Sequence, residues 1–372
     1  MALSAQQWLV KINELPVTET TKIMNVCGGH ERTIALSGLR SVLPEWIELI
    51  PGPGCPVCVC PEEDIYQAIQ LSLEKNIILA AFGDMLRVPV NAGKQAIRTL
   101  SQAKATGADI RAIASPIETL MIAKENPGQT VVFFAAGFET TFAPVAAMLA
   151  EGAPGNLLIL SSGRLTWPAV ALLLDSEQPN FDALIAPGHV ATVMGPEQWQ
   201  FVVSRHQLPV AIAGFTPDSL LAAIYSVLRQ RMDNHLFVDN CYEQVVKPGG
   251  NRRAQQFLSQ VFEVSDAPWR GIGTIPHSGY TLQAHFAHHD VQLHFGSFRE
   301  DARRHVGEMP PGCDCARVVM GKIKPVDCKL YGRLCVPSQP VGPCMVSDEG
   351  ACRIWWSAGI KPDVGLKSAE LT

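Results

Sequence analysis

The most distinctive pattern in the chain is a pair of cysteines, Cys55 and Cys58, within the run GPGCPVC at residues 52–58. Thiols at this spacing can form a small disulfide ring or share one metal ion, and the prolines limit how far the turn relaxes between those states. The pair is therefore predicted to do redox or metal chemistry, with a structural turn as the alternative. The surrounding glycines and Pro61 predict a rigid loop, whereas a thioredoxin-like motif would place its second cysteine in a helix. A helix is expected to follow at Glu62.

A second reactive thiol, Cys27, is followed by two glycines and His30 at the end of the first strand-like run. Because the glycines let the backbone fold tightly, the thiolate and the imidazole can both reach one small ligand or transition metal. The same two side chains could act as a nucleophile and its base. A buried thiol with a capping histidine is the structural alternative.

Six further cysteines gather near the C-terminus: Cys313, Cys315, Cys328, Cys335, Cys344 and Cys352. Four of them, Cys315, Cys328, Cys335 and Cys352, are spaced so that separate turns could bring four thiolates to a [4Fe-4S] cluster. Structural zinc is less favoured because two tight Cys-x-x-Cys knuckles are lacking, and simple burial of the thiols is the remaining alternative. A cluster would also supply folding free energy to a segment with few apolar runs.

Polar residues at two other run ends are weaker candidates. Glu139, in the run GFETT at residues 137–141, could serve a proton relay, a hydrogen-bonded support for a site, or only a helix N-cap. His189, in the run PGH, is read by default as a structural histidine. Asp84 and Arg87 are expected to form an ion pair rather than to catalyse.

These residues follow eight short apolar runs, which begin at about Ile23, Ile47, Ile77, Ile110, Val131, Leu157, Ala183 and Pro209. The distance between successive runs suits a strand and its crossover helix, and their continuous hydrophobicity predicts parallel strands buried on both faces. We therefore predict an α/β protein with an N-terminal helix at residues 1–20. Two lobes with parallel sheets of repeated strand-helix units are expected at 21–127 and 128–235, four runs to each, and a Cys-rich iron-sulfur region at 236–372. Since open parallel sheets bind ligands outside the carboxyl ends of their strands, the polar motifs are expected to meet at a cleft.

The composition excludes several classes of function. The 372 residues are 47% hydrophobic and 17% charged, which suits a globular protein with ample core. A formal net charge of −5, without a basic stripe interleaved with aromatic residues, argues against nucleic acid as a partner. The apolar runs are too short for a bilayer and the N-terminus lacks a signal-peptide core, so we expect a cytoplasmic protein with no membrane partner. Eleven cysteines in a reducing compartment favour metal or redox use over a disulfide framework.

Taken together, the motifs make the chain resemble the HypD family of hydrogenase maturation factors along essentially its whole length. The matching motifs lie at residues 27–30, 52–58, 82–85 with 87–89, 137–141, 186–190, and 345–347 with 349–352. The resemblance implies a three-part α/β protein that carries one [4Fe-4S] cluster. It also implies joint work with the small partner HypC and with HypE, to build the Fe(CN)2CO unit of [NiFe]-hydrogenases.

The resemblance further implies roles for individual residues. Cys27 would hold the iron, sharing it with a cysteine of HypC, and His30 would lie beside it. Cys55 and Cys58 would be a dithiol that exchanges electrons with the cluster. The cluster ligands would be Cys328, Cys335, Cys352 and Cys315, for which Cys313 could substitute. Glu139, Thr140 and His189 would line the cleft, and Cys60 and Cys344 are left without a role.

The sequence thus predicts a redox-active assembly scaffold rather than a turnover enzyme. A stand-alone iron-sulfur thiol-disulfide oxidoreductase that uses Cys55 and Cys58 is the main alternative. A zinc-stapled binding module is a third hypothesis.

Overall fold

All eight predicted runs are strands in the computed structural model, which describes residues 3–17, 19–93, 95–176, 179–305 and 309–362. They are β1 (Thr21–Asn25), β2 (Ile47–Pro51), β3 (Ile77–Phe82), β4 (Ile110–Ile113), β5 (Thr130–Gly137), β6 (Leu157–Gly163), β7 (Ala183–Pro187) and β8 (Val210–Ala213). Every pairing among them is parallel. In β3, the neighbouring residues Ile78 and Leu79 belong to the cores on opposite faces of the sheet. A strand that is buried on both faces has a continuous apolar sequence, as the predicted runs do. The predicted α/β class is confirmed.

The strands form two sheets, but not from consecutive groups of four. One sheet has the order β2-β1-β7-β8-β9, in which β9 (Val238–Asn240) was not predicted, and the other has the order β4-β3-β5-β6. We call the first the split lobe and the second the inserted lobe, because β3 to β6 interrupt the strands of the first. The predicted grouping of strands is therefore wrong. Periodicity could not reveal this, since a strand-helix unit has the same pattern whichever neighbour it pairs with.

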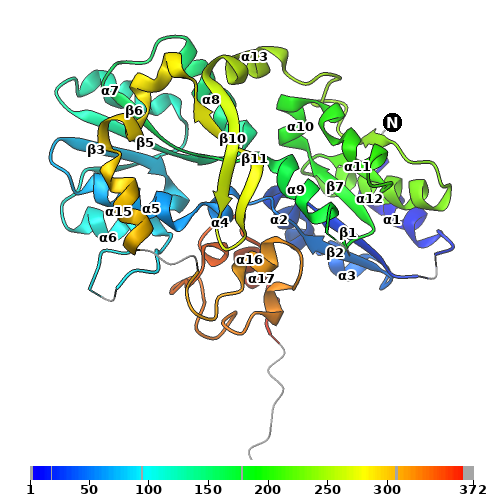
Figure 1. Ribbon diagram of the computed structural model, residues 1–372. Helices are drawn as coiled ribbons and strands as arrows, with labels where there is room; N and C mark the ends of the chain where they lie inside the picture. The colour runs from blue at the N-terminus through cyan, green and yellow to red at the C-terminus, as the bar shows by residue number, and fades with distance from the viewer. Residues whose placement is uncertain (1–2, 18, 94, 177–178, 306–308, 363–372) are drawn as a thin grey trace, which may run out of the picture.

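The split lobe has helices on both faces of its sheet (Figure 1). One face is covered by α1 (Ala5–Asn13), α2 (Gly28–Leu36), α3 (Leu39–Val42) and α12 (Pro217–Met232). The other is covered by α9 (Thr166–Leu174), α10 (Gly188–Met194), η2 (Pro196–Trp199) and α11 (Gln200–Ser204). Helix α1 begins after Ser4, whose side chain accepts a hydrogen bond from the Gln7 backbone in a capping box. Among the described residues, no helix is long and apolar enough to cross a membrane.

The inserted lobe is layered in the same way. Helices α5 (Glu62–Ser72) and α6 (Leu100–Ala105) share one core with its sheet, and α7 (Ile117–Glu125) and α8 (Glu139–Ala150) share the other. The short helices α4 (Pro56–Val59) and η1 (Gly83–Arg87) follow β2 and β3. The predicted ion pair between Asp84 and Arg87 is present in η1, at 3.5 Å between Oδ1 and Nη2, and is partly exposed.

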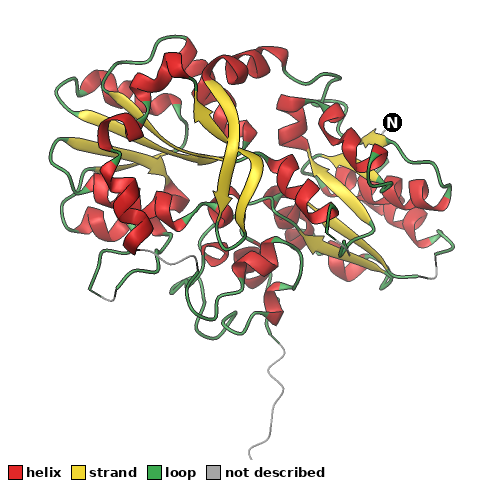
Figure 2. Ribbon diagram, in the orientation of Figure 1, coloured by secondary structure: helices red, strands yellow, loops and turns green. Residues whose placement is uncertain are grey.

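The chain after residue 240 is not one unit. Helix α13 (Arg252–Val261) packs on α8, and the antiparallel hairpin of β10 (Phe262–Trp269) and β11 (Gly273–Leu282) stands between the two lobes (Figure 2). It is followed by η3 (Ala284–His289), α14 (Val291–Phe295) and α15 (Ser297–His305), which packs on α5. Residues 309–362 form what we call the Cys-rich region, with α16 (Cys315–Val319), η4 (Pro325–Asp327), η5 (Pro343–Met345) and α17 (Ala351–Ser357).

The Cys-rich region lies beneath the junction of the lobes and contacts both (Figure 1). Towards the split lobe, the indole nitrogen of Trp355 donates a 2.6 Å hydrogen bond to the buried carboxylate of Glu31 on α2, which also binds Arg40. Towards the inserted lobe, the backbone N–H of Asp348 donates to Asp84 at 3.1 Å. These contacts fix the region relative to both sheets.

The aromatic contact that joins α8 to the hairpin should contribute strongly to stability. Phe142 is fully buried, and its ring centroid lies 5.2 Å from those of Phe262 and Tyr280. We expect Phe142→Ala to lower the free energy of unfolding by about 3–5 kcal/mol, because it leaves a cavity between two elements. Leu36→Ala, at a side chain that is 71% exposed, should change it by less than about 0.5 kcal/mol. Circular dichroism during denaturation measures both, and equal losses would contradict the expectation.

Candidate functional site

Each sheet has one point at which the strand order reverses, and the predicted motifs lie there. In the split lobe, β1 continues to β2 on one side while its other neighbour, β7, continues to β8 on the opposite side. The loops after β1 and β7 carry Cys27 and His189. In the inserted lobe the reversal lies between β3 and β5, and the loops there carry Asp84 and Glu139. Such reversals leave a crevice outside the carboxyl ends of parallel strands, which is where these folds bind ligands.

Cys27 is the N-cap residue of α2 and is partly exposed. Burial among the surrounding loops and, to a smaller extent, the nearby carboxyl group of Glu349 together raise the pKa of its thiol to about 12. The backbone N–H groups of His30 and Gly29 act in the opposite direction, as expected for a sulfur at a helix N-terminus. Without a metal, the sulfur is therefore held as a neutral thiol at neutral pH.

Cys27 and the Cys55–Cys58 pair line the same small cavity, of about 10 Å³. Two backbone segments meet there, because the N–H of Gly28 donates to the carbonyl oxygen of Gly54 at 3.1 Å. A Cβ atom on Gly54 would lie 2.4 Å from the Cα atom of Cys27, so only glycine permits this approach. The structure thus brings together two thiol sites that lie 28 positions apart in the sequence.

Cys55 and Cys58 are joined in a disulfide. Cys55 is the N-cap of α4, Pro56 is its first residue, and Cys58 lies inside this single turn of helix. The predicted rigid loop is therefore wrong in this detail, since proline at the first helical position begins a helix rather than preventing one. The predicted helix at Glu62 is confirmed as α5, with three acidic residues in its first turn.

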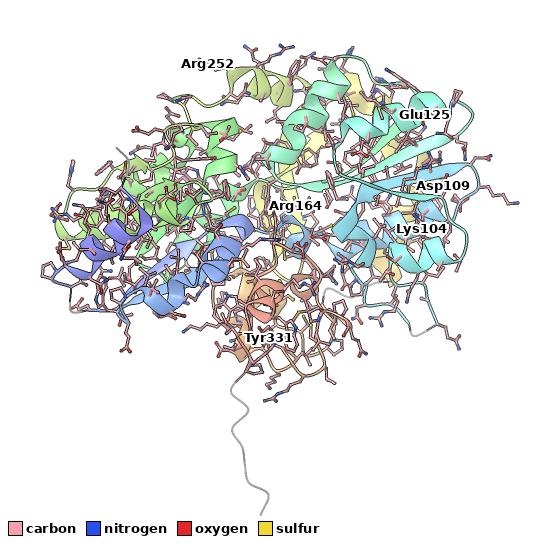
Figure 3. All side chains as sticks on the ribbon, turned by 180° about the vertical axis from the view of Figure 1, so that it is seen from behind. Lys104, Asp109, Glu125, Arg164, Arg252 and Tyr331 are labelled. Carbon is pink, nitrogen blue, oxygen red and sulfur yellow. A yellow bond between two sulfur atoms is a disulfide. The ribbon has the colours of Figure 1, made fainter. Side chains whose placement is uncertain are left out.

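Two buried arginines hold the segment that carries the disulfide. Arg164, after β6, lies 3.4 Å from the carboxylate of Asp64 and donates to the carbonyl oxygen of Pro268 in the hairpin at 2.9 Å. Figure 3 shows Arg164 near the middle of the molecule, with Tyr331 of the Cys-rich region below it. Arg270, in the hairpin turn, pairs with Glu62 and donates its backbone N–H to Val59 at 3.0 Å. The hairpin thus fixes α4 and α5 from above.

His30 and His189 meet on one aromatic ring, that of Phe215 after β8. The centroid of His30 lies 5.0 Å and that of His189 3.8 Å from the ring of Phe215. His30 is fully buried, its Nε2 lies 3.0 Å from the carbonyl oxygen of Ala213, and its Nδ1 has no hydrogen-bond partner among the described residues. Burial lowers the pKa of His30 to about 4 and also lowers that of the more exposed His189. Both histidines are therefore neutral at pH 7.

Glu139 is placed apart from these groups. Its side chain is fully buried, and its two carboxylate oxygens accept hydrogen bonds of 2.8 Å from the backbone and the hydroxyl of Thr166, at the start of α9. Burial raises the pKa of Glu139. Neither Glu139 nor Thr140 lines the cavity that holds Cys27. The geometry places Glu139 as a link between α8 and α9.

The six C-terminal cysteines converge. Cys344 forms hydrogen bonds with Cys315 and Cys352, and Cys313 forms one with Cys315. Cys335 and Cys328 lie close enough to Cys313 for its charge to raise their pKa values. Hydrogen bonds from Cys315 and Cys344 lower the pKa of Cys352 to about 6. Gly342 leaves room for two of the sulfurs, because a Cβ atom there would lie 2.5 Å from the Sγ atoms of both Cys313 and Cys315. In the described part of the chain, no group of three or more His, Cys, Asp or Glu side chains is arranged to hold a metal ion.

Glu349 is the residue at the cavity that sequence reasoning did not select. Its backbone packs on Gly28, where a Cβ atom would lie 2.6 Å from the carbonyl oxygen of Glu349. The side chain reaches solvent, yet enough protein surrounds it that desolvation, with the charge of Asp84, raises its pKa to about 7. Only its place inside a matched motif, three positions before Cys352, could have pointed to it.

Comparisons with known proteins agree with this geometry. A family model named HypD and described as the hydrogenase formation hypA family matches residues 4–359. The chain belongs to the HypD family. It is 40% identical over 339 residues to the hydrogenase maturation factor HypD of Escherichia coli, covering 90% of this chain and 88% of that protein. It is 38% identical over 352 residues to HypD of Rhodobacter capsulatus, covering 94% and 90% of the two chains. It is also 39% identical over 350 residues to a putative hydrogenase expression/formation protein of Methanocaldococcus jannaschii, covering 93% and 94%.

The resemblance inferred from the motifs is therefore confirmed, and with it the predicted role in hydrogenase maturation. Within the HypD family frame, the Cys-rich region is compatible with metal binding. The matched segment includes every element that lines the Cys27 cavity.

The raised pKa of Cys27 predicts a steep pH dependence of its reactivity. In the iron-free protein, alkylation of Cys27 by iodoacetamide should accelerate by about tenfold per pH unit from pH 7 to 10, because only the thiolate reacts. Glu349→Gln should speed the reaction at a fixed pH by removing a negative charge, whereas Glu45→Gln, at an exposed remote position, should not. Peptide mass spectrometry follows the reaction. A rate that levels off by pH 8 would contradict the raised pKa.

Proposed function

We propose that the chain is a scaffold and redox protein that assembles the Fe(CN)2CO unit of [NiFe]-hydrogenases. A HypC-type small chaperone would share the iron, and a HypE-type protein would donate cyanide. The observation that carries the proposal is the shared cavity, which is lined by Cys27 and by the Cys55–Cys58 disulfide. Glu349 and Ala351, just before Cys352, line the same cavity. Nine of the eleven cysteines are free, which favours a reducing compartment such as the cytoplasm.

Cys27 suits the role of iron holder. Low-spin iron with cyanide and carbonyl ligands is a soft centre that prefers thiolate. The backbone N–H groups at the N-terminus of α2 point at this sulfur. They stabilise the negative charge of the thiolate that would bind the iron. Because the free thiol is protonated, iron binding must release a proton from Sγ. The carboxylate of Glu349 lines the same cavity and is exposed to solvent, so it can accept this proton and pass it to water.

The donor set of the Cys-rich region fits a [4Fe-4S] cluster. Soft thiolates come there from separate turns, as such a cluster needs, and six sulfurs are present where a cubane takes four. We assign Cys328, Cys335, Cys352 and Cys315 as ligands, with Cys313 as the substitute for Cys315. When bound, the cluster would supply electrons one at a time. Reduction of the Cys55–Cys58 disulfide takes up two electrons and two protons and gives two thiols, which makes this pair a store of electrons beside Cys27.

The alternative, a stand-alone thiol-disulfide oxidoreductase, is less well supported. The side chains of Cys55 and Cys58 are only 5% and 3% exposed, so a protein disulfide has no direct access to either sulfur. An attacking thiolate must reach one sulfur in line for exchange to occur. The short path from this pair leads instead to Cys27.

Replacement of Cys27 distinguishes the assembly scaffold from the stand-alone thiol-disulfide oxidoreductase. In the protein co-purified anaerobically with its small partner, we expect infrared bands of cyanide and carbon monoxide, and Cys27→Ser should abolish them while retaining the iron-sulfur absorption. Cys241→Ser, at a thiol hydrogen-bonded to Asp239 in the split lobe, is the matched control and should retain the bands. Bands that survive in Cys27→Ser would refute the assignment of the iron. Retained hydrogenase maturation in that variant would favour the oxidoreductase.

Single replacements should identify the fourth cluster ligand. Cys328→Ser, Cys335→Ser and Cys352→Ser should each lower the iron content of anaerobically reconstituted protein well below four per chain. Of Cys315→Ser and Cys313→Ser, we expect the first to cause the larger loss, because Cys315 contacts three of the other thiols. Iron and sulfide analysis with electron paramagnetic resonance decides between them. A colourless, folded wild type that contains zinc would refute the cluster.

A further inference from the structure

Arg270 is a buried cation at the point where the hairpin, α5 and the Cys-rich region meet. The residue is 3% exposed and lies in the turn between β10 and β11. Its guanidinium pairs with Glu62, whose other oxygen accepts from the backbone of Asn91 at 3.1 Å, and it donates to the carbonyl oxygen of Pro89 at 3.0 Å. A charge at this depth is retained only where partners compensate its desolvation.

Those partners satisfy only one of the three guanidinium nitrogens. Nη2 makes the contacts with Glu62 and Pro89, whereas Nε and Nη1 have no hydrogen-bond acceptor in the described residues. Buried donors without acceptors cost about 1–3 kcal/mol each, and more when charged. The ion pair with Glu62 therefore does not explain why an arginine, with five donors, occupies this place.

The same turn touches the Cys-rich region directly. A Cβ atom on Gly271 would lie 2.7 Å from Cγ of Met309 and 2.9 Å from Cβ of Ala316, the residue after Cys315. The charge of Arg270 also reaches two thiols. The pKa of Cys313 is raised by its hydrogen bond to Cys315 and by burial, and burial raises the pKa of Cys60 to about 12. The positive charge of Arg270 acts to lower both pKa values. The geometry therefore places a buried cation with unpartnered donors beside the residue that follows Cys315.

We propose that Arg270 is a positioning and tuning residue for the iron-sulfur centre, which its buried positive charge makes easier to reduce. This inference rests on the proposed cluster. Reduction adds one negative charge to the centre, and a nearby cation in a poorly screened interior stabilises the product more than the reactant. The unpartnered N–H groups offer hydrogen bonds to thiolate or sulfide, which act in the same direction. Glu62 opposes this effect and so sets its size.

The test compares reduction of the reconstituted centre in the full chain. Dithionite titration with redox dyes, followed by electron paramagnetic resonance of the reduced form, gives the ratio of reduced to oxidised centre at a fixed potential. Glu62→Gln, which leaves the cation without its countercharge, should raise this ratio. Adding Arg270→Gln to that variant should lower the ratio by at least about tenfold, or about 59 mV for one electron. The double variant contains no unpaired buried charge, so its folding is protected where either single variant could fail, and its ratio should also lie below that of the wild type.

Two further variants separate charge from structure. Arg270→Lys keeps the charge but loses the guanidinium donors, so its ratio should lie between that of the wild type and that of the double variant. Arg317→Gln removes an arginine that is only two positions from Cys315 but 60% exposed, and water screens it, so the ratio should stay unchanged. Equal ratios in Glu62→Gln and the double variant, with a wild type that holds its cluster, would overturn the role of Arg270 alone. A wild type without iron and sulfide would overturn the proposed cluster and this inference with it.

Discussion

The close approach of three backbone segments around Gly28 is the constraint on which the site depends. The N–H of Gly28 binds the loop after β2 through Gly54, and its missing Cβ leaves room for the backbone of Glu349. The loop after β1, the loop after β2 and the segment of the Cys-rich region that carries Glu349 therefore meet at a single point. A side chain of any size at residue 28 or 54 would push these segments apart, and the thiols they carry would separate with them.

The three groups of thiols differ in how far they are exposed. The Cys27 sulfur is held neutral and partly exposed, the neighbouring disulfide is buried, and five of the six C-terminal thiols are buried in the region beneath the junction of the lobes (Figure 1). Each group has different access to water. Burial protects the disulfide and most of the C-terminal thiols from solutes, since reactive thiolates are oxidised most readily where water and oxidants reach them.

The sequence predicted what depends on local chemistry and missed what depends on pairing. The eight strand starts, the helix at Glu62 and the position of Cys27 at a strand end follow from apolar runs, an acidic first turn and glycine. The interruption of one sheet by the other, and β9 with only three residues, follow from contacts that no periodicity records. The sequence cannot decide the role of Glu139, because a carboxylate at a strand end has the same pattern whether it binds a ligand or Thr166. Glu349 and Arg270 carry no local pattern at all.

The order of strands in the split lobe has a consequence for synthesis. Its strands β1 and β2 emerge from the ribosome first, yet the neighbour that completes the crevice, β7, follows more than 130 residues after β2. The inserted lobe can fold while the two halves of the other lobe remain incomplete. Neither the stack of His30 and His189 on Phe215 nor the cover that Glu349 gives to Cys27 exists in a nascent fragment. The surroundings of Cys27 are therefore complete only after residue 349 has been synthesised, when the chain is nearly finished.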